Sequence, residues 1–262
     1  QMQICGRYQS VAPRHDLAFH AGSPDQSHVL LCRCESTTHR DIRAGSGPAV
    51  RMQSVFEGWQ VLYPVARGND RNVDTFRESS VTATWDGDEG LGLHLGPRAM
   101  NLAIEKAREH GMGAVAVKNT KHFGMLAYYV MQAIDQDMVG MAMVSAGGGA
   151  QVPTNGAEPA FGTQPIAWGA PADKMPPFVF DVATTQVAAN KLALTRRIGS
   201  KIEPGWIANL DGSPIMEAVD VPEFGSFNML PFGGTRENGG HKGYGFAAIA
   251  DIMSGILSGN GP

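Results

Sequence analysis

The chain has 262 residues, of which 43% are hydrophobic and 18% charged, so it is long enough to bury a substantial core in one large domain or two small ones. Its formal net charge of -4 gives no electrostatic footprint for a nucleic acid, and no apolar run approaches the roughly 20 residues that span a membrane. We therefore expect a soluble globular protein that binds neither nucleic acid nor membrane.

Cysteine usage and the amino-terminal residues bear on the cellular compartment. The three cysteines, Cys5, Cys32 and Cys34, are odd in number and include a C-x-C pair, which indicates neither a disulfide framework nor a zinc site. Residues 1–30 show no charged segment followed by an apolar one, so no signal peptide is predicted. We expect a cytoplasmic protein, and Gln1 in place of a methionine suggests a processed chain or a fragment.

The first third of the chain gives few structural signals. No element is assigned over residues 1–45, where only 29–31 hints at a short buried segment. Loosely spaced apolar residues are compatible with a helix over 49–63. Alternation with β-branched residues predicts a strand over 80–85, and the Asp-Gly-Asp at 86–88 predicts a turn after it.

The middle of the chain has the clearest pattern. A helix is predicted over 97–110, with Pro97 at its first position and Gly111 just past its end. The short apolar run over 113–117 favours a strand covered on both faces, and a second such strand is predicted over 138–144. A helix beginning at about Gly124 separates them, so the order predicts a right-handed, parallel βαβ unit.

His122 lies in the polar turn between the first of these strands and its helix. Open α/β sheets usually bind ligands at the carboxyl ends of their strands. An imidazole there, with an ordinary pKa of ~6.5, can exchange a proton with a substrate near neutral pH. The alternative is a surface histidine in a loop beside Lys118 and Lys121.

Two segments further along carry other candidate groups. The glycine turn over 145–150 follows the second strand and offers bare backbone N–H groups to a ligand, or is simply a tight turn. After a loop and strand over 162–171, a strand over 178–185 contains Asp181 near its end and precedes a helix over 186–198. Asp181 is expected to cap that helix, the commoner use of such a residue, or to bind a hydroxyl.

The glycine-rich segment over 233–245 precedes an apolar helix predicted over 246–257. Its lysine, Lys242, and the N-terminal N–H groups of the helix form a plausible anion cradle that would fit a cofactor pyrophosphate. A flexible surface loop is the alternative. No G-x-G-x-x-G opens a helix after a strand, so the usual dinucleotide fingerprint is absent.

Four ordered motifs together resemble the malate/L-lactate dehydrogenase family, the type-2, non-Rossmann group. They are Lys118-to-Gly124 with its His-Phe-Gly, Gly162-Thr-x-Pro-Ile-Ala, Asp181-x-Ala-Thr-Thr185, and Gly240-His-Lys-Gly-Tyr-Gly245 leading into Asp251-x-x-Ser-Gly-x-Leu-Ser-Gly259. The match covers about residues 80–259. It implies a non-Rossmann α/β fold with a mixed sheet and flanking helices. It also implies a homodimer that uses NAD or NADP to act on small 2-hydroxy or 2-oxo acids.

The resemblance also implies roles for single residues. His122 matches the catalytic acid/base, which agrees with the need for a base when a hydroxyl is oxidised. The cofactor contacts of the family match two residues after the next strand, a strip on a later strand and the lysine of the glycine-rich loop: Ser145, Ala146, Asp181, Val182, Ala183 and Lys242. No acid or arginine can be assigned to the adenosine ribose, so NAD and NADP both remain open. No metal is expected.

The substrate carboxylate requires a cation, ideally an arginine. The segment from Ser46 to Met52 resembles the family's Ser-His-Gly-x-x-Arg, which assigns Arg51 and Ser46 to the substrate. Gly47 stands where the family has a second active-site histidine, and His39 is a lower-ranked alternative for that role.

The resemblance divides the chain into two parts. Residues 1–79 are expected to form a divergent, partly irregular segment on the substrate side, and residues 80–262 an NAD(P)-binding catalytic core that is truncated at its carboxyl end. The leading hypothesis is an active dehydrogenase. A catalytically impaired cofactor-binding or oligomerisation remnant is a second, and a metal hydrolase using His122, His241 and Asp181 is a weaker third, because their spacing matches no known ligand motif.

Overall fold

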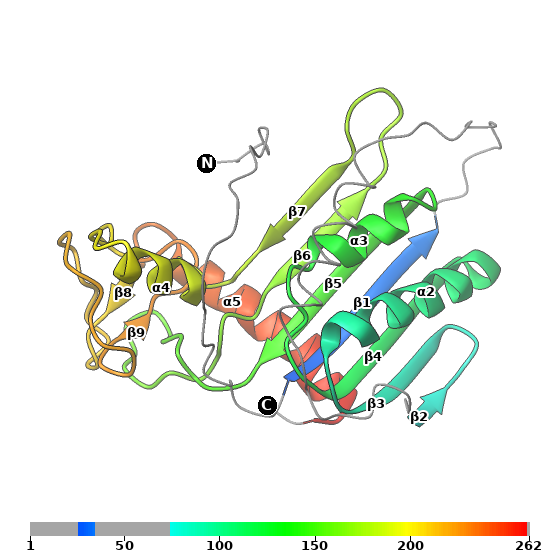
Figure 1. Ribbon diagram of the computed structural model, residues 1–262, viewed down its shortest axis with the longest axis horizontal. Coiled ribbons are helices and arrows are strands. Elements are labelled where there is room, and N and C mark those ends of the chain that lie inside the picture. Colours follow the sequence, from blue (N-terminus) through cyan, green and yellow to red (C-terminus); the bar gives the residue numbers. More distant parts are fainter. Residues whose placement is uncertain (1–25, 35–73, 261–262) are drawn as a thin grey trace.

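The computed structural model describes residues 26–34 and 74–260, which form a mixed α/β unit (Figure 1). Its largest element is a seven-stranded sheet in the order β2-β3-β4-β1-β5-β6-β7. The strands are β1 (Gln26–Cys34), β2 (Asp74–Glu78), β3 (Thr82–Gly90), β4 (Met112–Thr120), β5 (Met138–Ala146), β6 (Ile166–Ala170) and β7 (Phe178–Val182). The predicted helix over 49–63 lies outside the described residues.

Helices cover both faces of this sheet (Figure 1). α2 (Gly92–His110) and α3 (Ala127–Ile134) lie on one face, and α5 (Gly240–Asp251) continues into the π-helix η1 (Ile252–Ile256) behind the other. The remaining elements, α4 (Ala189–Arg197), β8 (Ile207–Ala208) and β9 (Asn228–Met229), form a small lobe beyond one end of the sheet. The expected α/β fold with a mixed sheet and flanking helices is confirmed.

β3, β4, β5 and β7 all run in one direction. β3 pairs in parallel with β4, whereas β1 is antiparallel to both β4 and β5. β6 is likewise antiparallel to both β5 and β7. The carboxyl ends of these four strands therefore meet at the same edge of the sheet, which is where the functional candidates of the sequence were expected.

The position of β1 corrects the predicted βαβ unit. β4 and β5 are parallel, as predicted, but they are not neighbours, because β1 lies between them and pairs with both. No element was assigned to residues 26–34 from the sequence. An antiparallel strand arriving from a distant part of the chain gives no local signal that it will enter a parallel unit.

α2 begins earlier than predicted, so Pro97 lies inside the helix instead of at its first position. Glycines in its first two turns let two aromatic rings come close to the helix axis. A Cβ atom added at Gly92 would lie 1.9 Å from the ring of Phe123, and one added at Gly96 would lie 2.4 Å from the ring of Tyr129. These contacts hold the start of α2 against Phe123, which precedes α3, and against Tyr129 in the first turn of α3.

Two other boundaries differ from the predictions. β3 continues through the turn predicted at 86–88, because Asp88 (φ 47°) and Glu89 (φ 56°) adopt left-handed conformations that form an irregularity without ending the strand. α5 begins at Gly240, well before the predicted start at 246, so the glycine-rich motif forms the first turns of the helix.

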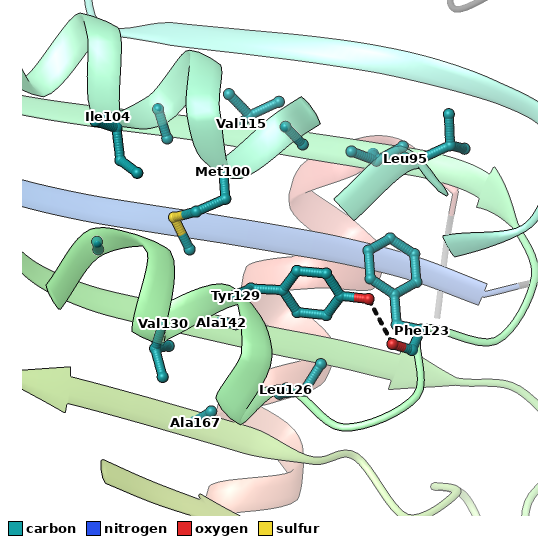
Figure 2. Packing of buried hydrophobic residues seen from close by; sticks show 14 of the residues in the cluster. Leu95, Met100, Ile104, Val115, Phe123, Leu126, Tyr129, Val130, Ala142 and Ala167 are labelled. Atoms are coloured by element: carbon teal, nitrogen blue, oxygen red, sulfur yellow. Dashed lines mark hydrogen bonds between the residues drawn. The ribbon is translucent and has the colours of Figure 1, made fainter. Parts of the chain in front are cut away.

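The side chains of β5 alternate between two hydrophobic clusters. Ala142 and Val144 belong to the main core beneath α2 and α3, whereas Met143 packs with Ile166 and with Ala250 of α5 on the opposite face. Figure 2 shows the main core, in which the Tyr129 ring is enclosed between the two helices and the sheet. A third cluster, which includes Leu192, Ile202, Ile207 and Met229, forms the core of the small lobe.

Candidate functional site

The parallel strands bring three predicted segments to one edge of the sheet. The pairing register places Thr120, at the end of β4, and Ala146, at the end of β5, on either side of the same β1 residue, Gln26. Two strand spacings of about 4.8 Å put these strand ends roughly 10 Å apart. His122 follows Thr120 by two residues, and so the His122 turn and the Ser145–Ala146 pair lie along the same edge.

The turn containing His122 is anchored by its neighbour, Phe123. The Tyr129 hydroxyl, which is fully buried, donates a hydrogen bond of 2.5 Å to the Phe123 carbonyl oxygen (Figure 2). The two rings meet edge to face with centroids 5.6 Å apart, and Phe123 is itself buried. The backbone next to His122 is therefore held by the first turn of α3.

The His122 ring reaches solvent, but protein atoms surround much of it. This desolvation lowers the pKa of His122 below its ordinary value of 6.5. The Gly124 N–H donates a hydrogen bond of 2.9 Å to His122 Nδ1, which also suits a neutral ring, since a protonated ring has no acceptor nitrogen. The structure thus favours a neutral imidazole near pH 7.

The lysines beside His122 are engaged with acidic residues of β3. Lys118 Nζ lies 3.5 Å from Asp86 Oδ2, and Lys121 Nζ lies 3.3 Å from Glu89 Oε2. The irregular end of β3 thus supplies counter-charges to the turn. Both lysines are therefore already paired with carboxylates, and neither is a free cation that could bind a substrate carboxylate.

Asp181, from β7, caps a different helix from the one expected. Its Oδ2 accepts a hydrogen bond of 2.8 Å from the N–H of Ala127, the first residue of α3. Burial raises the pKa of Asp181, opposed by the backbone N–H groups of Ala127 and Leu126. The predicted cap of the following helix is wrong, because α4 has no side-chain cap. A residue distant in sequence thus stabilises the helix that follows the His122 turn.

Val182 ends β7, and Ala183 follows it at the same edge of the sheet. The chain beyond them is tied to the loop before β6, since Thr184 donates from both its N–H and its hydroxyl to the Thr163 carbonyl oxygen, at 2.9 and 3.0 Å. Both Val182 and Ala183 are half-buried. They thus line an ordered strand end that is partly open to solvent.

Lys242 is exposed in the first turn of α5. The glycine-rich segment that contains it is tightly packed and connected, through Phe232, to the residues after β7. Phe232 N–H donates to the Thr184 carbonyl at 2.7 Å, and a Cβ atom added at Gly243 would lie 2.0 Å from the Phe232 oxygen. Close packing therefore accounts for Gly243, and the segment brings Lys242 towards the end of β7.

Ser145 and Ala146 belong to a buried polar network that the sequence did not reveal. Ser145 Oγ donates to Asp251 Oδ1 at 2.6 Å, and Ala146 N–H donates to Gln164 Oε1 at 2.6 Å. Gln164 Nε2 also donates to Asp251 Oδ1, at 2.9 Å. Gln164 and Asp251 stand within the quoted motifs, but nothing in their spacing indicates that they meet in the fold.

The predicted substrate residues Arg51 and Ser46 lie outside the described residues, as do Gly47 and His39. Within residues 26–34 and 74–260, no group of three His, Cys, Asp or Glu side chains could hold a metal ion. None of the helices described in this part of the chain is both long and apolar enough to cross a membrane.

Comparison with known proteins gives one consistent family. Residues 67–261 match the family model described as malate/L-lactate dehydrogenase. The malate dehydrogenase of Pyrococcus horikoshii is 43% identical over 244 residues, covering 91% of this chain and 64% of that protein. The L-sulfolactate dehydrogenase of Methanocaldococcus jannaschii is 38% identical over 185 residues, covering 71% of this chain and 51% of that protein.

A solved structure agrees with this result. The crystal structure of malate dehydrogenase from Entamoeba histolytica has a TM-score of 0.66 and 32% sequence identity, covering 80% of this chain and 58% of that one. The chain spans little more than half the length of several proteins that it matches. The family match and the shared fold establish that the chain belongs to the malate/L-lactate dehydrogenase family.

Proposed function

We propose that this chain binds NAD or NADP and transfers a hydride between the nicotinamide and a small 2-hydroxy or 2-oxo acid. The observation that carries the proposal is the convergence of His122, the end of β5 and the end of β7 at one edge of the sheet. Relatives named malate dehydrogenase and L-sulfolactate dehydrogenase support this substrate class. Because they are named as enzymes, they favour an active dehydrogenase over an impaired remnant.

The backbone at this edge suits a dinucleotide. A Cβ atom added at Gly148, in the turn after β5, would meet nothing within 4 Å, so a ligand can approach the bare backbone there. The first turn of α5 combines a helix N-terminus with the exposed Lys242, which together favour a phosphate. Ser145, Ala146, Asp181, Val182 and Ala183 would contribute the remaining contacts. The nicotinamide supplies the hydride acceptor or donor when it is bound.

His122 would exchange the proton of the reacting oxygen. In the oxidising direction, the substrate hydroxyl proton would pass to a neutral His122, while the hydride would leave the carbon that bears this hydroxyl for the nicotinamide. The lowered pKa of His122 keeps the ring neutral near pH 7, which is the charge state that this step requires. Arg51 and Ser46 would bind the substrate carboxylate, an assignment that rests on the sequence motif alone.

The hydrogen bond from Gly124 also determines which nitrogen of the neutral His122 ring carries the proton. With Nδ1 accepting from the Gly124 N–H, a neutral ring carries its proton on Nε2 and can donate a hydrogen bond to the carbonyl oxygen of an oxo acid. To accept a hydroxyl proton at Nε2, the ring must move its own proton to Nδ1 and release Gly124. We expect ¹⁵N NMR of the ligand-free protein to show the Nε2–H form of His122, and a dominant Nδ1–H form would contradict this geometry.

We further propose that the protein is cytoplasmic and forms a homodimer. The small acid would be its ligand, and the protein would bind neither nucleic acid nor membrane. Two measurements on the purified chain would identify the cofactor and the acid. Fluorescence titration with NADH and NADPH gives the cofactor preference, and turnover of malate, lactate, sulfolactate and ureidoglycolate gives the substrate. His122→Ala should abolish turnover and keep cofactor affinity within about threefold. A mutant that turns over at the wild-type rate would refute the role of His122, and binding without turnover by the wild type would favour the remnant.

A further inference from the structure

A buried carboxylate stands at the junction of the predicted cofactor segments. Asp251 is only 5% exposed, yet none of the ion pairs found among the described residues involves it. Its Oδ1 accepts from Ser145 Oγ at 2.6 Å and from Gln164 Nε2 at 2.9 Å. A buried charged group is costly unless it is well hydrogen-bonded, so these two donors stabilise the carboxylate, and removing it would leave both of them without this acceptor.

Gln164 transmits the position of Asp251 to the end of β5. Its side chain is fully buried, and its backbone is left-handed, with φ 34°, which is uncommon for a residue other than glycine. Its Nε2 is held by Asp251 and lies 3.3 Å from Ser145 Oγ, and its Oε1 accepts from the Ala146 N–H at 2.6 Å. Both ends of the Gln164 amide are thus fixed, and the assignment of its oxygen and nitrogen follows from their partners.

The loop that carries Gln164 also reaches the end of β7. A Cβ atom added at Gly162 would lie 2.4 Å from the Ala146 carbonyl oxygen, so this loop packs directly on the end of β5. The Thr163 carbonyl accepts both of the hydrogen bonds that Thr184, just after β7, donates. Asp251 itself belongs to α5, the helix that begins beside Lys242. One network therefore joins the end of β5, the end of β7 and α5.

We propose that Asp251 is a positioning residue that holds Gln164, and through it the Ala146 amide, in the geometry that the cofactor site requires. The proposal rests on the proposed function, because it assumes that Ser145 and Ala146 contact the cofactor. Its chemistry makes a specific prediction about pairs of substitutions. Gln164→Glu alone should place two carboxylates against each other. Adding Asp251→Asn should restore a donor, because the new side-chain amide can donate to the new carboxylate.

The first measurement is hydrogen exchange of the Ala146 amide, compared with the free energy of unfolding of each variant. Gln164→Glu should reduce the protection of this amide by about tenfold or more, beyond any change in global stability, and the double variant should recover most of it. Asp251→Ala provides a second single variant. If protection at Ala146 changed only in step with global stability, or if the double variant stayed as low as Gln164→Glu, the proposal would be wrong.

The second measurement is the dissociation constant for NADH and NADPH. We expect it to rise about tenfold or more in Gln164→Glu and to return to within about threefold of wild type in the double variant. Lys106→Met is the control for a merely structural effect. Lys106 is buried at the opposite edge of the sheet, where its Nζ donates to Glu78 Oε1 at 2.8 Å and to the Ser79 carbonyl at 2.7 Å. This variant should lose stability and keep its cofactor affinity.

The two measurements separate the two proposals. A wild-type chain that binds neither cofactor would refute the proposed function, while rescue of Ala146 protection in the double variant would still support the positioning role. Conversely, cofactor affinity that is unchanged in Gln164→Glu, in a wild type that binds, would overturn the role of the network at the cofactor site.

Discussion

Replacing Tyr129 with phenylalanine removes one buried hydrogen bond while keeping the ring that packs between α2 and α3. The lost bond is the 2.5 Å contact from the hydroxyl to the Phe123 carbonyl, next to His122. Tyr129 is fully buried, so water cannot replace the donor without rearrangement. We expect the free energy of unfolding to fall by about 1–2 kcal/mol. For a chain of this size, that corresponds to a loss of about 2–8 °C in Tm.

Urea unfolding followed by circular dichroism measures this change. Tyr244→Phe is the matched control, because Tyr244 is only half-buried and no hydrogen bond of its hydroxyl is found among the described residues. It should change stability by less than about 0.5 kcal/mol. A Tyr129→Phe variant as stable as wild type, or a control that loses as much, would refute the assignment of this bond as an anchor of the His122 turn.

The same substitution has a pH dependence with a definite sign. Burial, with smaller contributions from Tyr128 and Asp181, raises the pKa of Tyr129 far above its ordinary value of 10. The folded state therefore keeps the hydroxyl proton at pH values where the unfolded state releases it. The stabilisation that the protonated Tyr129 hydroxyl gives to the folded state is fully present below pH 10 and is lost as the pH rises above 10. The stability difference between wild type and Tyr129→Phe should accordingly narrow above pH 10.

Three other predictions concern the same edge of the sheet. Because the pKa of His122 is lowered in the folded state, the unfolded state binds more protons than the folded state just below pH 6.5. The free energy of unfolding should therefore rise with pH up to about 6.5. His122→Gln should flatten this rise, as measured by urea unfolding at several pH values. Gly92→Ala should destabilise the protein by about 1–3 kcal/mol, because the new Cβ would meet the Phe123 ring. Gly245→Ala is the control: its Cβ would meet nothing within 4 Å, so it should stabilise α5 by about 0.5–1 kcal/mol. Equal effects of the two substitutions in calorimetry would refute the contact between Gly92 and the Phe123 ring. Lys242→Met should weaken NADH binding by about fivefold at low salt, and an unchanged titration would remove Lys242 from the cofactor site.

Local pattern predicted most of the sheet that follows residue 80. Short apolar runs and periodic helices located β4, α3 and β5, because these signals depend only on neighbours in sequence. The parallel direction of β4 and β5 followed from the same pattern. What the pattern could not give was their separation by β1, since the pairing of Val29 with Ala116 and Met143 depends on residues far along the chain.

The site shows the same division between local and long-range information. His122 could be placed at a strand end from sequence because its strand and helix are contiguous with it. Asp181 was assigned to the wrong helix because its partner, Ala127, is remote in sequence and near only in the fold. Gln164 and Asp251 were missed as a pair for the same reason, since their hydrogen bond joins the loop before β6 to α5.

The insertion of β1 between β4 and β5 also has a consequence for how the chain folds. Helical turns and the β3-α2-β4 unit can form from nearby residues, but β4 and β5 remain two separate edges until β1 joins both. Contacts of such long sequence separation carry a loop-closure cost that is met before they stabilise anything, which slows folding. Completion of the sheet, and with it the approach of the His122 turn to the end of β5, is thus expected to be a late step. A chain without residues 26–34 would leave two strand edges open to pairing with other molecules.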